Sequence, residues 1–202
     1  MRSAAILAGG RATRFGGRDK SALLVEGRPI VERQLAELSA VADDIMIVGA
    51  RADGARAFQA SGANYRAIAD IVPGCGPLGG LHAALTEMRS DRVVLVACDM
   101  PYLDGRFAEY LLSLAGDAAV VVPETDRGYH PLCAVYTRAC LEPVAARLAK
   151  RQLALLGLFT DVPTRIVTAA EMSRFGAPSR LLANVNTPDE YAGLDALQSH
   201  KL

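Results

Sequence analysis

The feature that most constrains the fold lies at the start of the chain, where a short apolar run leads directly into a glycine-rich, basic loop. Residues 4–8 read Ala-Ala-Ile-Leu-Ala, and residues 9–20 read Gly-Gly-Arg-Ala-Thr-Arg-Phe-Gly-Gly-Arg-Asp-Lys. A short apolar run bounded by glycines predicts a buried strand. The glycines let the loop backbone approach a ligand closely, and the cations supply positive charge. This combination favours a phosphate-binding loop over a solvated basic turn.

Two common phosphate-binding motifs do not account for this loop. The P-loop requires Gly-Lys followed by Ser or Thr, but two residues separate Gly17 from Lys20. The dinucleotide fingerprint Gly-x-Gly-x-x-Gly is absent from the loop and is matched only by residues 74–79. There, four residues intervene between the preceding strand and the first glycine, and the unit comes late in the chain. We therefore interpret the second match as a coincidence and not as a nicotinamide or flavin site.

Composition limits the size and the partners of the protein. The 202 residues carry 22 Lys and Arg against 22 Asp and Glu, and this balance excludes a broadly basic nucleic-acid binder. No linker divides the chain, so we expect one domain over residues 1–202.

No apolar stretch is long enough for a membrane span and no signal peptide is recognisable, so we expect a cytoplasmic protein. The four cysteines show no Cys-x-x-Cys pair and no zinc spacing, and we interpret them as reduced packing residues.

Strands and helices alternate along most of the chain. Apolar patterns predict strands at 4–8, 45–48, 65–69, 93–97, 118–123, 132–136 and 165–167, and helices after Pro29 and at 55–60, 81–88, 104–114, 139–150, 152–159 and 188–197. The connection 124–131 is too short for a parallel crossover, so the strand after it is expected to run antiparallel or to change sheet. The alternation predicts an α/β fold, a three-layer α/β/α sandwich with a mostly parallel, Rossmann-like sheet and one antiparallel strand.

The run 93–97 is the most apolar strand and suits the centre of a parallel sheet. It leads to Asp99 at the carboxyl edge, where the first strand also delivers Gly9. Ligands of open α/β sheets bind beyond those carboxyl ends. We therefore expect Asp99 and the basic loop to face one crevice, while the competing interpretation of Asp99 is a turn residue ahead of Pro101.

These motifs together resemble those of the molybdenum cofactor guanylyltransferases, the MobA type of nucleotidyltransferase. The likeness rests on Leu-Ala-Gly-Gly-x3-Arg-x-Gly-Gly-x-Asp-Lys at 7–20 and on later motifs in the same order: Asp70 with Gly-Pro-Leu-Gly-Gly at 76–80, Cys-Asp-Met-Pro at 98–101, His-Pro at 130–131 and Asn-Val-Asn-Thr-Pro at 184–188. The resemblance implies transfer of GMP from GTP to molybdopterin carrying molybdenum, release of pyrophosphate and a need for Mg²⁺. It also implies a nucleotide-diphospho-sugar transferase type of fold and contact with other proteins of the cofactor pathway.

The resemblance assigns roles to individual residues. It makes Asp99 the Mg²⁺ ligand and, with Arg14 and Lys20, part of the catalytic set. Nucleotide binding falls to Leu7, Ala8, Gly9, Gly10, Lys20, Asp70, Gly79 and Asp99, and the pterin side to His130, Asn184 and Asn186. The chemistry is consistent with such a set, because an attacking phosphate oxygen is already ionised and catalysis reduces to alignment and charge stabilisation. Mg²⁺ needs only one or two carboxylates beside the nucleotide's own phosphates.

Structural interpretations compete with several of these roles. Arg14 and Lys20 could instead be exposed cations, and Asp70 could be a turn residue that ends a strand. Gly79 could be a position where tight packing requires glycine, and His130 could be an ordinary loop residue. Thr187 and Glu190 have the spacing of a capping box, and a helix cap is therefore the competing account of Asn184 and Asn186.

The sequence departs from the family pattern at two places, of which the first is a tolerable apolar exchange and the second leaves the nucleotide base open. Phe15 stands where the family often has methionine, and residues 48–51 lack the asparagine that contacts the nucleotide in well-known members. The alternatives are a molybdopterin cytidylyltransferase or another nucleotidyltransferase of the same fold. A further alternative is a protein that binds nucleotide without turning it over. Lys20 and Asp99 argue against it, because pure binding needs no magnesium carboxylate opposite a basic loop.

Overall fold

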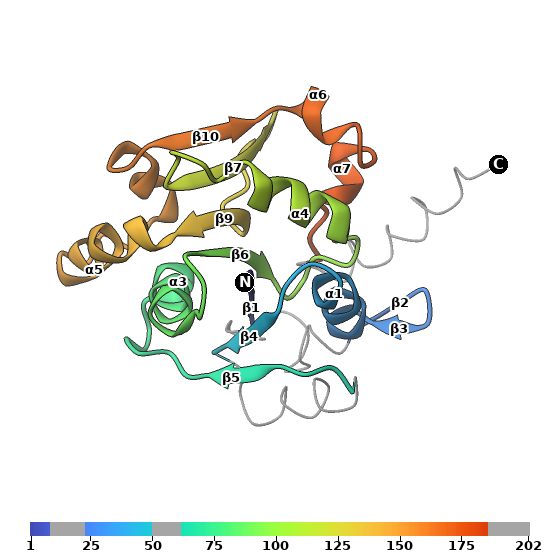
Figure 1. Cartoon of the computed structure of the whole chain (residues 1–202), viewed down its shortest axis with the longest axis horizontal. Helices are drawn as coiled ribbons and strands as arrows, with labels where there is room; N and C mark the ends of the chain where they lie inside the picture. The colour runs from blue at the N-terminus through green and yellow to red at the C-terminus, as the bar shows by residue number, and fades with distance from the viewer. Residues whose placement is uncertain (9–22, 50–61, 186–202) are drawn as a thin grey trace.

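The computed structural model describes residues 1–8, 23–49 and 62–185, and its centre is a mixed sheet (Figure 1). The strand order is β10-β7-β9-β6-β1-β4-β5, with the short β8 paired to β7. The strands are β1 (Ser3–Leu7), β4 (Asp44–Val48), β5 (Arg66–Ile68), β6 (Arg92–Ala97), β7 (Val120–Thr125), β8 (Gly128–Tyr129), β9 (Cys133–Thr137) and β10 (Thr164–Val167).

Strand direction brings several carboxyl ends to one edge of the sheet. Strand β1 pairs in parallel with both β4 and β6, and β4 pairs in parallel with β5. Strand β9 lies antiparallel to both β6 and β7, so β7 points the same way as β6. The predicted mostly parallel sheet with an antiparallel strand is therefore confirmed. The two-residue β8, which the sequence patterns did not predict, adds a third antiparallel pairing.

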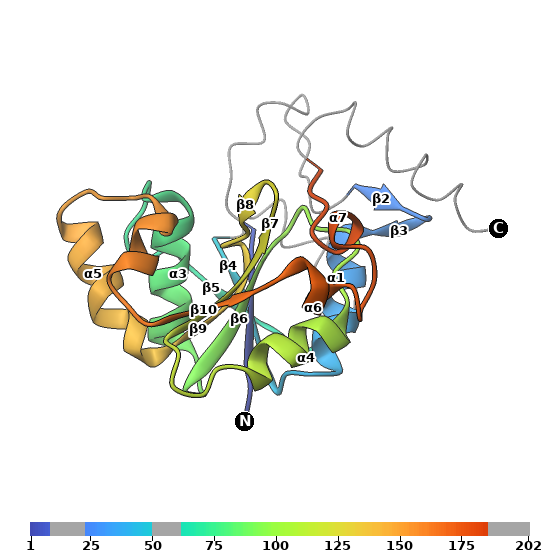
Figure 2. The same cartoon turned by 90° about the horizontal axis from the view of Figure 1, so that it is seen from above.

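Helices cover both faces of the sheet and give the predicted three layers (Figure 2). One face carries α1 (Ile30–Ser39), α4 (Gly105–Ser113), α6 (Ala169–Met172) and α7 (Pro178–Leu181). The other carries α3 (Gly76–Glu87), α5 (Leu141–Ala149) and the 3₁₀ helix η4 (Leu155–Thr160), with the short 3₁₀ turn η3 (Arg138–Cys140) leading into α5. Among the described residues, no helix combines the length and the apolar character needed to cross a bilayer.

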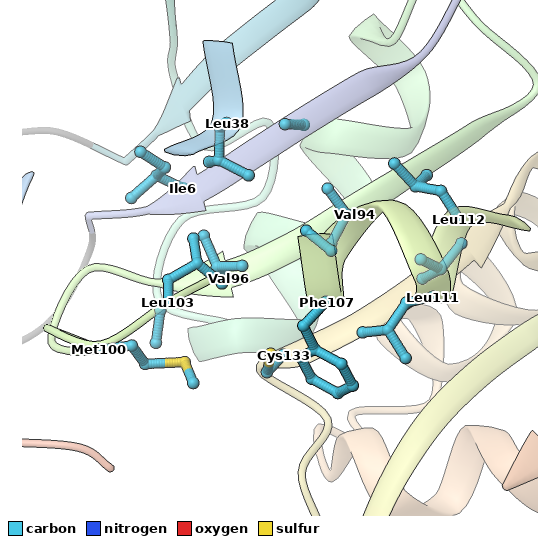
Figure 3. Close-up of a cluster of buried hydrophobic side chains, with 14 of the residues drawn as sticks. Ile6, Leu38, Val94, Val96, Met100, Leu103, Phe107, Leu111, Leu112 and Cys133 are labelled. Carbon is cyan, nitrogen blue, oxygen red and sulfur yellow. The ribbon is translucent and has the colours of Figure 1, made fainter. Parts of the chain in front are cut away.

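Alternate residues of the central strands feed the two cores. Ile6 and Val94 face α1 and α4 and pack with Leu38, Phe107 and Leu111 in the cluster of Figure 3. Their strand neighbours point to the opposite face, toward α3 and α5. Burying a side chain such as Phe107, which is 1% exposed, contributes about 2–3 kcal/mol. The continuous apolar runs seen in the sequence are thus strands that are covered on both faces.

The boundaries of several elements differ from the predicted ones. Helix α3 begins at Gly76 and not at residue 81, because glycines at 79 and 80 allow close packing within its first turns. Pro29 is the residue before α1 and not its first helical residue. The predicted helix 152–159 is the shorter η4. The predicted helices 55–60 and 188–197 lie outside the described residues.

Two local predictions concern the entries into α1 and α4. Asp104 caps α4 as predicted, since its carboxylate accepts the N–H groups of Arg106 at 2.8 Å and Phe107 at 3.3 Å. Ahead of α1, an unpredicted hairpin joins β2 (Leu24–Val25) to β3 (Arg28–Pro29). Its two loop residues have positive φ angles, 52° and 75°. Positive φ at both positions is typical of a tight two-residue hairpin turn.

A buried ion pair ties together the amino edge of the sheet. The Asp44 carboxylate accepts Arg66 Nε at 2.8 Å and Nη2 at 3.0 Å, the Ser3 hydroxyl at 3.0 Å and the Arg89 N–H at 3.2 Å. Burial alone would raise the pKa of Asp44, but these donors together hold it below its ordinary value. The pair lies at the opposite end of the strands from Asp99.

Candidate functional site at the carboxyl edge

The segment that carries Asp99 leaves the sheet between two neighbouring strands. Leu7 lies opposite Ala97 in the parallel register of β1 and β6, and Cys98 N–H donates to Leu7 O at 3.1 Å. On the other side, Ala97 N–H donates to Leu132 O at 2.9 Å. Asp99 is half-buried and follows directly. The end of β1, after which the basic loop begins, is therefore adjacent to the Asp99 segment.

The backbone at the end of β1 is partly committed to the sheet. Ala8 N–H donates to Val48 O at 2.9 Å, beyond the last paired residue of β1. Its N–H is thus not a donor for a ligand, and Leu7 O already accepts the Cys98 N–H. The predicted nucleotide contact of Ala8 therefore narrows to its carbonyl group. The predicted residues Gly9, Gly10, Arg14 and Lys20 lie outside the described part of the chain.

Helix α3 begins at the same edge and packs closely against its surroundings. A Cβ on Gly79 would lie 3.0 Å from the Cys75 Cβ and 3.1 Å from the Val72 carbonyl oxygen, and one on Gly80 would lie 2.9 Å from a methyl of Leu7. Both glycines are buried. The contacts identify a packing role at Gly79, the alternative that the sequence left open beside nucleotide binding.

We expect Gly79→Ala to lower the free energy of unfolding by about 1 kcal/mol, because the added methyl meets a backbone carbonyl that must shift. Nucleotide affinity of the folded variant should stay unchanged. Urea unfolding and calorimetric titration measure the two quantities, with Gly116→Ala, which adds a methyl in open space, as the control. A loss of nucleotide affinity with an unchanged free energy of unfolding would show that Gly79 contributes to nucleotide binding and not to packing.

Asp70 is exposed and lies two residues past the end of β5. Three strand spacings of about 4.8 Å separate β5 from β6, so the strand that leads to Asp70 is about 14 Å from the strand that leads to Asp99. In the described ranges, no three His, Cys, Asp or Glu side chains form a cluster able to hold a metal. A hard cation at Asp99 fits this donor set if phosphate oxygens and water complete its shell, as Mg²⁺ commonly accepts.

His130 lies ahead of β9, two residues before Leu132, whose carbonyl accepts the Ala97 N–H. Its Nε2 lies 2.9 Å from the Thr125 hydroxyl, and its N–H donates to Pro123 O at 2.9 Å. Burial lowers the pKa of His130, and the nearby Arg127 lowers it further. The imidazole is therefore neutral near pH 7, and its pairing with Thr125 holds the ring against the last residue of β7.

The C-terminal part of the described chain also reaches Asp99. Val185 N–H donates to Asp99 O at 2.9 Å, and the Val185 side chain is buried with Val25, Ile30 and Tyr102. Asn184 beside it is exposed. The structure thus brings Asn184 next to the Asp99 segment, a neighbourhood that no sequence pattern predicted. Asn186 lies beyond the described residues.

Sequence reasoning missed two side chains of α1 that contact the same segment. Gln34 Nε2 donates to Ala97 O at 2.7 Å and to Met100 O at 3.0 Å, and Arg33 Nε donates to Pro101 O at 3.1 Å. A signal for Gln34 was present in the sequence. The glutamine stands within the apolar stripe of α1, where an apolar residue is expected.

Comparisons with known proteins agree with this geometry. The family model described as a MobA-like NTP transferase domain matches residues 4–160. A molybdenum cofactor guanylyltransferase from Desulfosudis oleivorans is 29% identical over 192 residues, which cover 95% of this chain and 93% of that protein. The structure resembles molybdopterin-guanine dinucleotide biosynthesis protein A from Archaeoglobus fulgidus, with a TM-score of 0.80 at 23% identity over 98% of each chain. It also resembles a manganese complex of Rv0371c from Mycobacterium tuberculosis, with a TM-score of 0.65 at 18% identity over 95% and 96% of the two chains.

Proposed function

Since the chain belongs to the MobA-like NTP transferase domain family, we propose that it transfers GMP from GTP to molybdopterin carrying molybdenum and releases pyrophosphate. The relative from Desulfosudis oleivorans is named a molybdenum cofactor guanylyltransferase, and the similarity covers 93% of that protein. We propose further that residues 1–202 act as one nucleotidyltransferase domain. The four cysteines are free, which is in keeping with a reducing compartment such as the cytoplasm.

One observation carries the proposal. The Asp99 segment is hydrogen-bonded to Leu7, two residues before the start of the basic loop, and to Val185, directly after Asn184. Leu7, one of the residues proposed to bind the nucleotide, and Val185, the neighbour of the proposed pterin residue Asn184, are thereby both bonded to the Asp99 segment. A transfer between two substrates requires such an arrangement, because the reacting atoms must meet at the group that holds the phosphates.

The chemistry needs few protein groups. An oxygen of the molybdopterin phosphate attacks the α-phosphorus of GTP, a new P–O–P linkage forms, and the bond to the departing pyrophosphate breaks. The attacking oxygen is already ionised, so no residue has to remove a proton. Lys20 and Arg14 neutralise the charge that gathers on pyrophosphate, and the carbonyl group of Ala8, next to Leu7, orients the nucleotide.

Mg²⁺ is the proposed metal, and Asp99 the proposed protein ligand. The ion would neutralise phosphate charge and hold the phosphate oxygens in position for attack. The single carboxylate fits an ion that keeps several waters and nucleotide oxygens. The Mycobacterium tuberculosis protein with the same fold was crystallised with manganese, a divalent ion that shares the preference for oxygen ligands.

We expect Lys20→Ala to lower kcat by about 100-fold while GTP affinity falls far less, because the ammonium acts mainly on charge that develops in the transition state. Steady-state kinetics and calorimetric GTP titration separate the two effects. Lys150→Ala, which removes an exposed cation next to α5, is the control and should change neither. Equal losses of kcat and affinity would assign Lys20 to ground-state binding instead.

Nucleotide choice tests the proposal at the binding step. Calorimetry with Mg²⁺ should give tighter binding of GTP than of CTP, ATP or a nicotinamide dinucleotide. Tighter binding of CTP would keep the fold and site but make the protein a cytidylyltransferase, the alternative favoured by the missing asparagine after β4. Binding of the dinucleotide alone would mean that the glycines at 74–79 form a true fingerprint.

A further inference from the structure

Gln34 is a fully buried polar residue whose presence packing does not explain. It has no exposed surface and lies on the face of α1 that also presents Val31, Leu35 and Leu38 to the core. A buried amide is unfavourable unless hydrogen bonds replace its water. Its Oε1 has no hydrogen-bond partner among the described residues. A leucine would fill the space without that cost, so the amide must contribute something else.

The other end of the amide supplies that contribution. Both N–H groups are used, since Nε2 donates to Ala97 O at 2.7 Å and to Met100 O at 3.0 Å. Carbonyl oxygens only accept hydrogen bonds, which identifies the nitrogen as the atom facing them. The two carbonyls lie on either side of Cys98 and Asp99. One side chain therefore fixes the turn that follows β6 at both of its ends.

The Asp99 segment is held from several sides. Cys98 N–H is bonded to Leu7 O and Asp99 O to Val185 N–H, while the amide of Gln34 holds the two flanking carbonyls from inside the protein. A short aspartate side chain follows its backbone closely, so a fixed backbone fixes where the carboxylate lies. Metal affinity depends strongly on groups that orient a ligand without touching the ion.

We propose that Gln34 is a positioning residue that holds the Asp99 carboxylate ready for the divalent metal of the nucleotide complex. The inference rests on the proposed role of Asp99. It predicts that Gln34 affects the part of nucleotide binding that depends on metal and leaves the metal-free part unchanged.

The test measures GTP affinity by calorimetry in EDTA and at saturating Mg²⁺, and takes the ratio of the two dissociation constants as the metal-dependent gain. In Gln34→Met, which keeps the side-chain length but has no donor, we expect the gain to fall by about 10-fold. The affinity in EDTA should not change. Gln34→Asn keeps the amide on a shorter side chain that cannot reach both carbonyls. Its metal-dependent gain should lie between that of Gln34→Met and that of the unchanged protein. The half-saturating Mg²⁺ concentration for turnover should rise in the same order.

Leu38→Val is the matched control. Leu38 is fully buried on the same face of α1, one turn further toward the amino edge, within the cluster of Figure 3. Its truncation should lower the midpoint of thermal unfolding without changing the metal-dependent gain. A similar loss of gain in Leu38→Val would show that Gln34 acts only through general stability, and would overturn the inference.

Asp99→Ala separates failure of the inference from failure of the proposed function. If Asp99→Ala removes the gain while Gln34→Met keeps all of it, the metal site stands and the positioning role of Gln34 is wrong. If Asp99→Ala keeps the full gain, the metal is held elsewhere, and both the proposed metal site and the proposed role of Gln34 are wrong.

Discussion

Asp99→Ala is expected to lower kcat by about 100- to 1,000-fold at saturating Mg²⁺, the largest loss of activity from any single change in the described residues. A metal ion contributes several kcal/mol to transition-state stabilisation, and each 1.36 kcal/mol corresponds to a tenfold rate. Asp99 is half-buried at the end of β6, so the variant should still fold. Circular dichroism establishes the fold, and release of pyrophosphate measures the turnover.

The matched control is Asp126→Ala. Asp126 is an exposed carboxylate in the turn between β7 and β8, at the same edge of the sheet. Its loss should leave kcat unchanged, which would exclude a general effect of negative charge near the site. Full activity of Asp99→Ala would show that the metal ligand has been assigned to the wrong residue.

Asp44→Asn is expected to lower the free energy of unfolding by about 3 kcal/mol at pH 7 and to leave kcat unchanged. The variant removes one member of a buried ion pair and leaves Arg66, with only about a quarter of its side chain exposed, with the longer 3.8 Å ion pair to Glu87. The network lies at the amino edge, far along the strands from Asp99. Urea unfolding measures the loss, and the same assay of pyrophosphate release measures activity.

The pH dependence of this difference follows from the lowered pKa of Asp44. The carboxylate's contribution is complete above the unfolded-state pKa of about 3.9 and is lost as the pH falls through the lower pKa of the folded state. The difference in the free energy of unfolding between the unchanged protein and Asp44→Asn should therefore become smaller below about pH 4. Asp91→Asn, at an exposed pair with Arg92, should cost about 0.5 kcal/mol or less. An equal loss in both variants would contradict the account of the buried pair.

The strands of the central sheet were predictable because a strand covered on both faces needs an uninterrupted apolar run. Residues 93–97 are such a run, and they form most of β6. The cap of α4 was predictable for a similar reason, since Asp104 combines a capping side chain with an apolar stripe directly after it. In both cases one local pattern has one favourable structure.

The short elements were not predictable, because contacts with distant residues produce them. Strand β8 exists through the pairing of Tyr129 with Glu124, and a two-residue strand has no periodicity. The early start of α3 has the same origin. Gly79 and Gly80 indicate a loop when considered alone, and only the approach of Val72 and Leu7 explains glycine within a helix.

The candidate site was predictable as far as the rules for parallel sheets extend. They place Asp99 and the end of β1 at one edge, and the register of Leu7 with Ala97 confirms this. The hydrogen bond from Val185 to Asp99 and the two from Gln34 have no counterpart in any local pattern. A polar residue within the apolar stripe of α1 was the only sign, and it did not reveal its partners.

The most direct test of GMP transfer is the product itself. The protein is incubated with molybdopterin carrying molybdenum, Mg²⁺ and either GTP or CTP, and mass spectrometry identifies the dinucleotide while a coupled assay counts pyrophosphate. We predict that GTP yields the guanine dinucleotide with one pyrophosphate for each transfer, and that CTP yields far less product. Preferential formation of the cytosine dinucleotide, or no transfer from either nucleotide, would contradict the assignment.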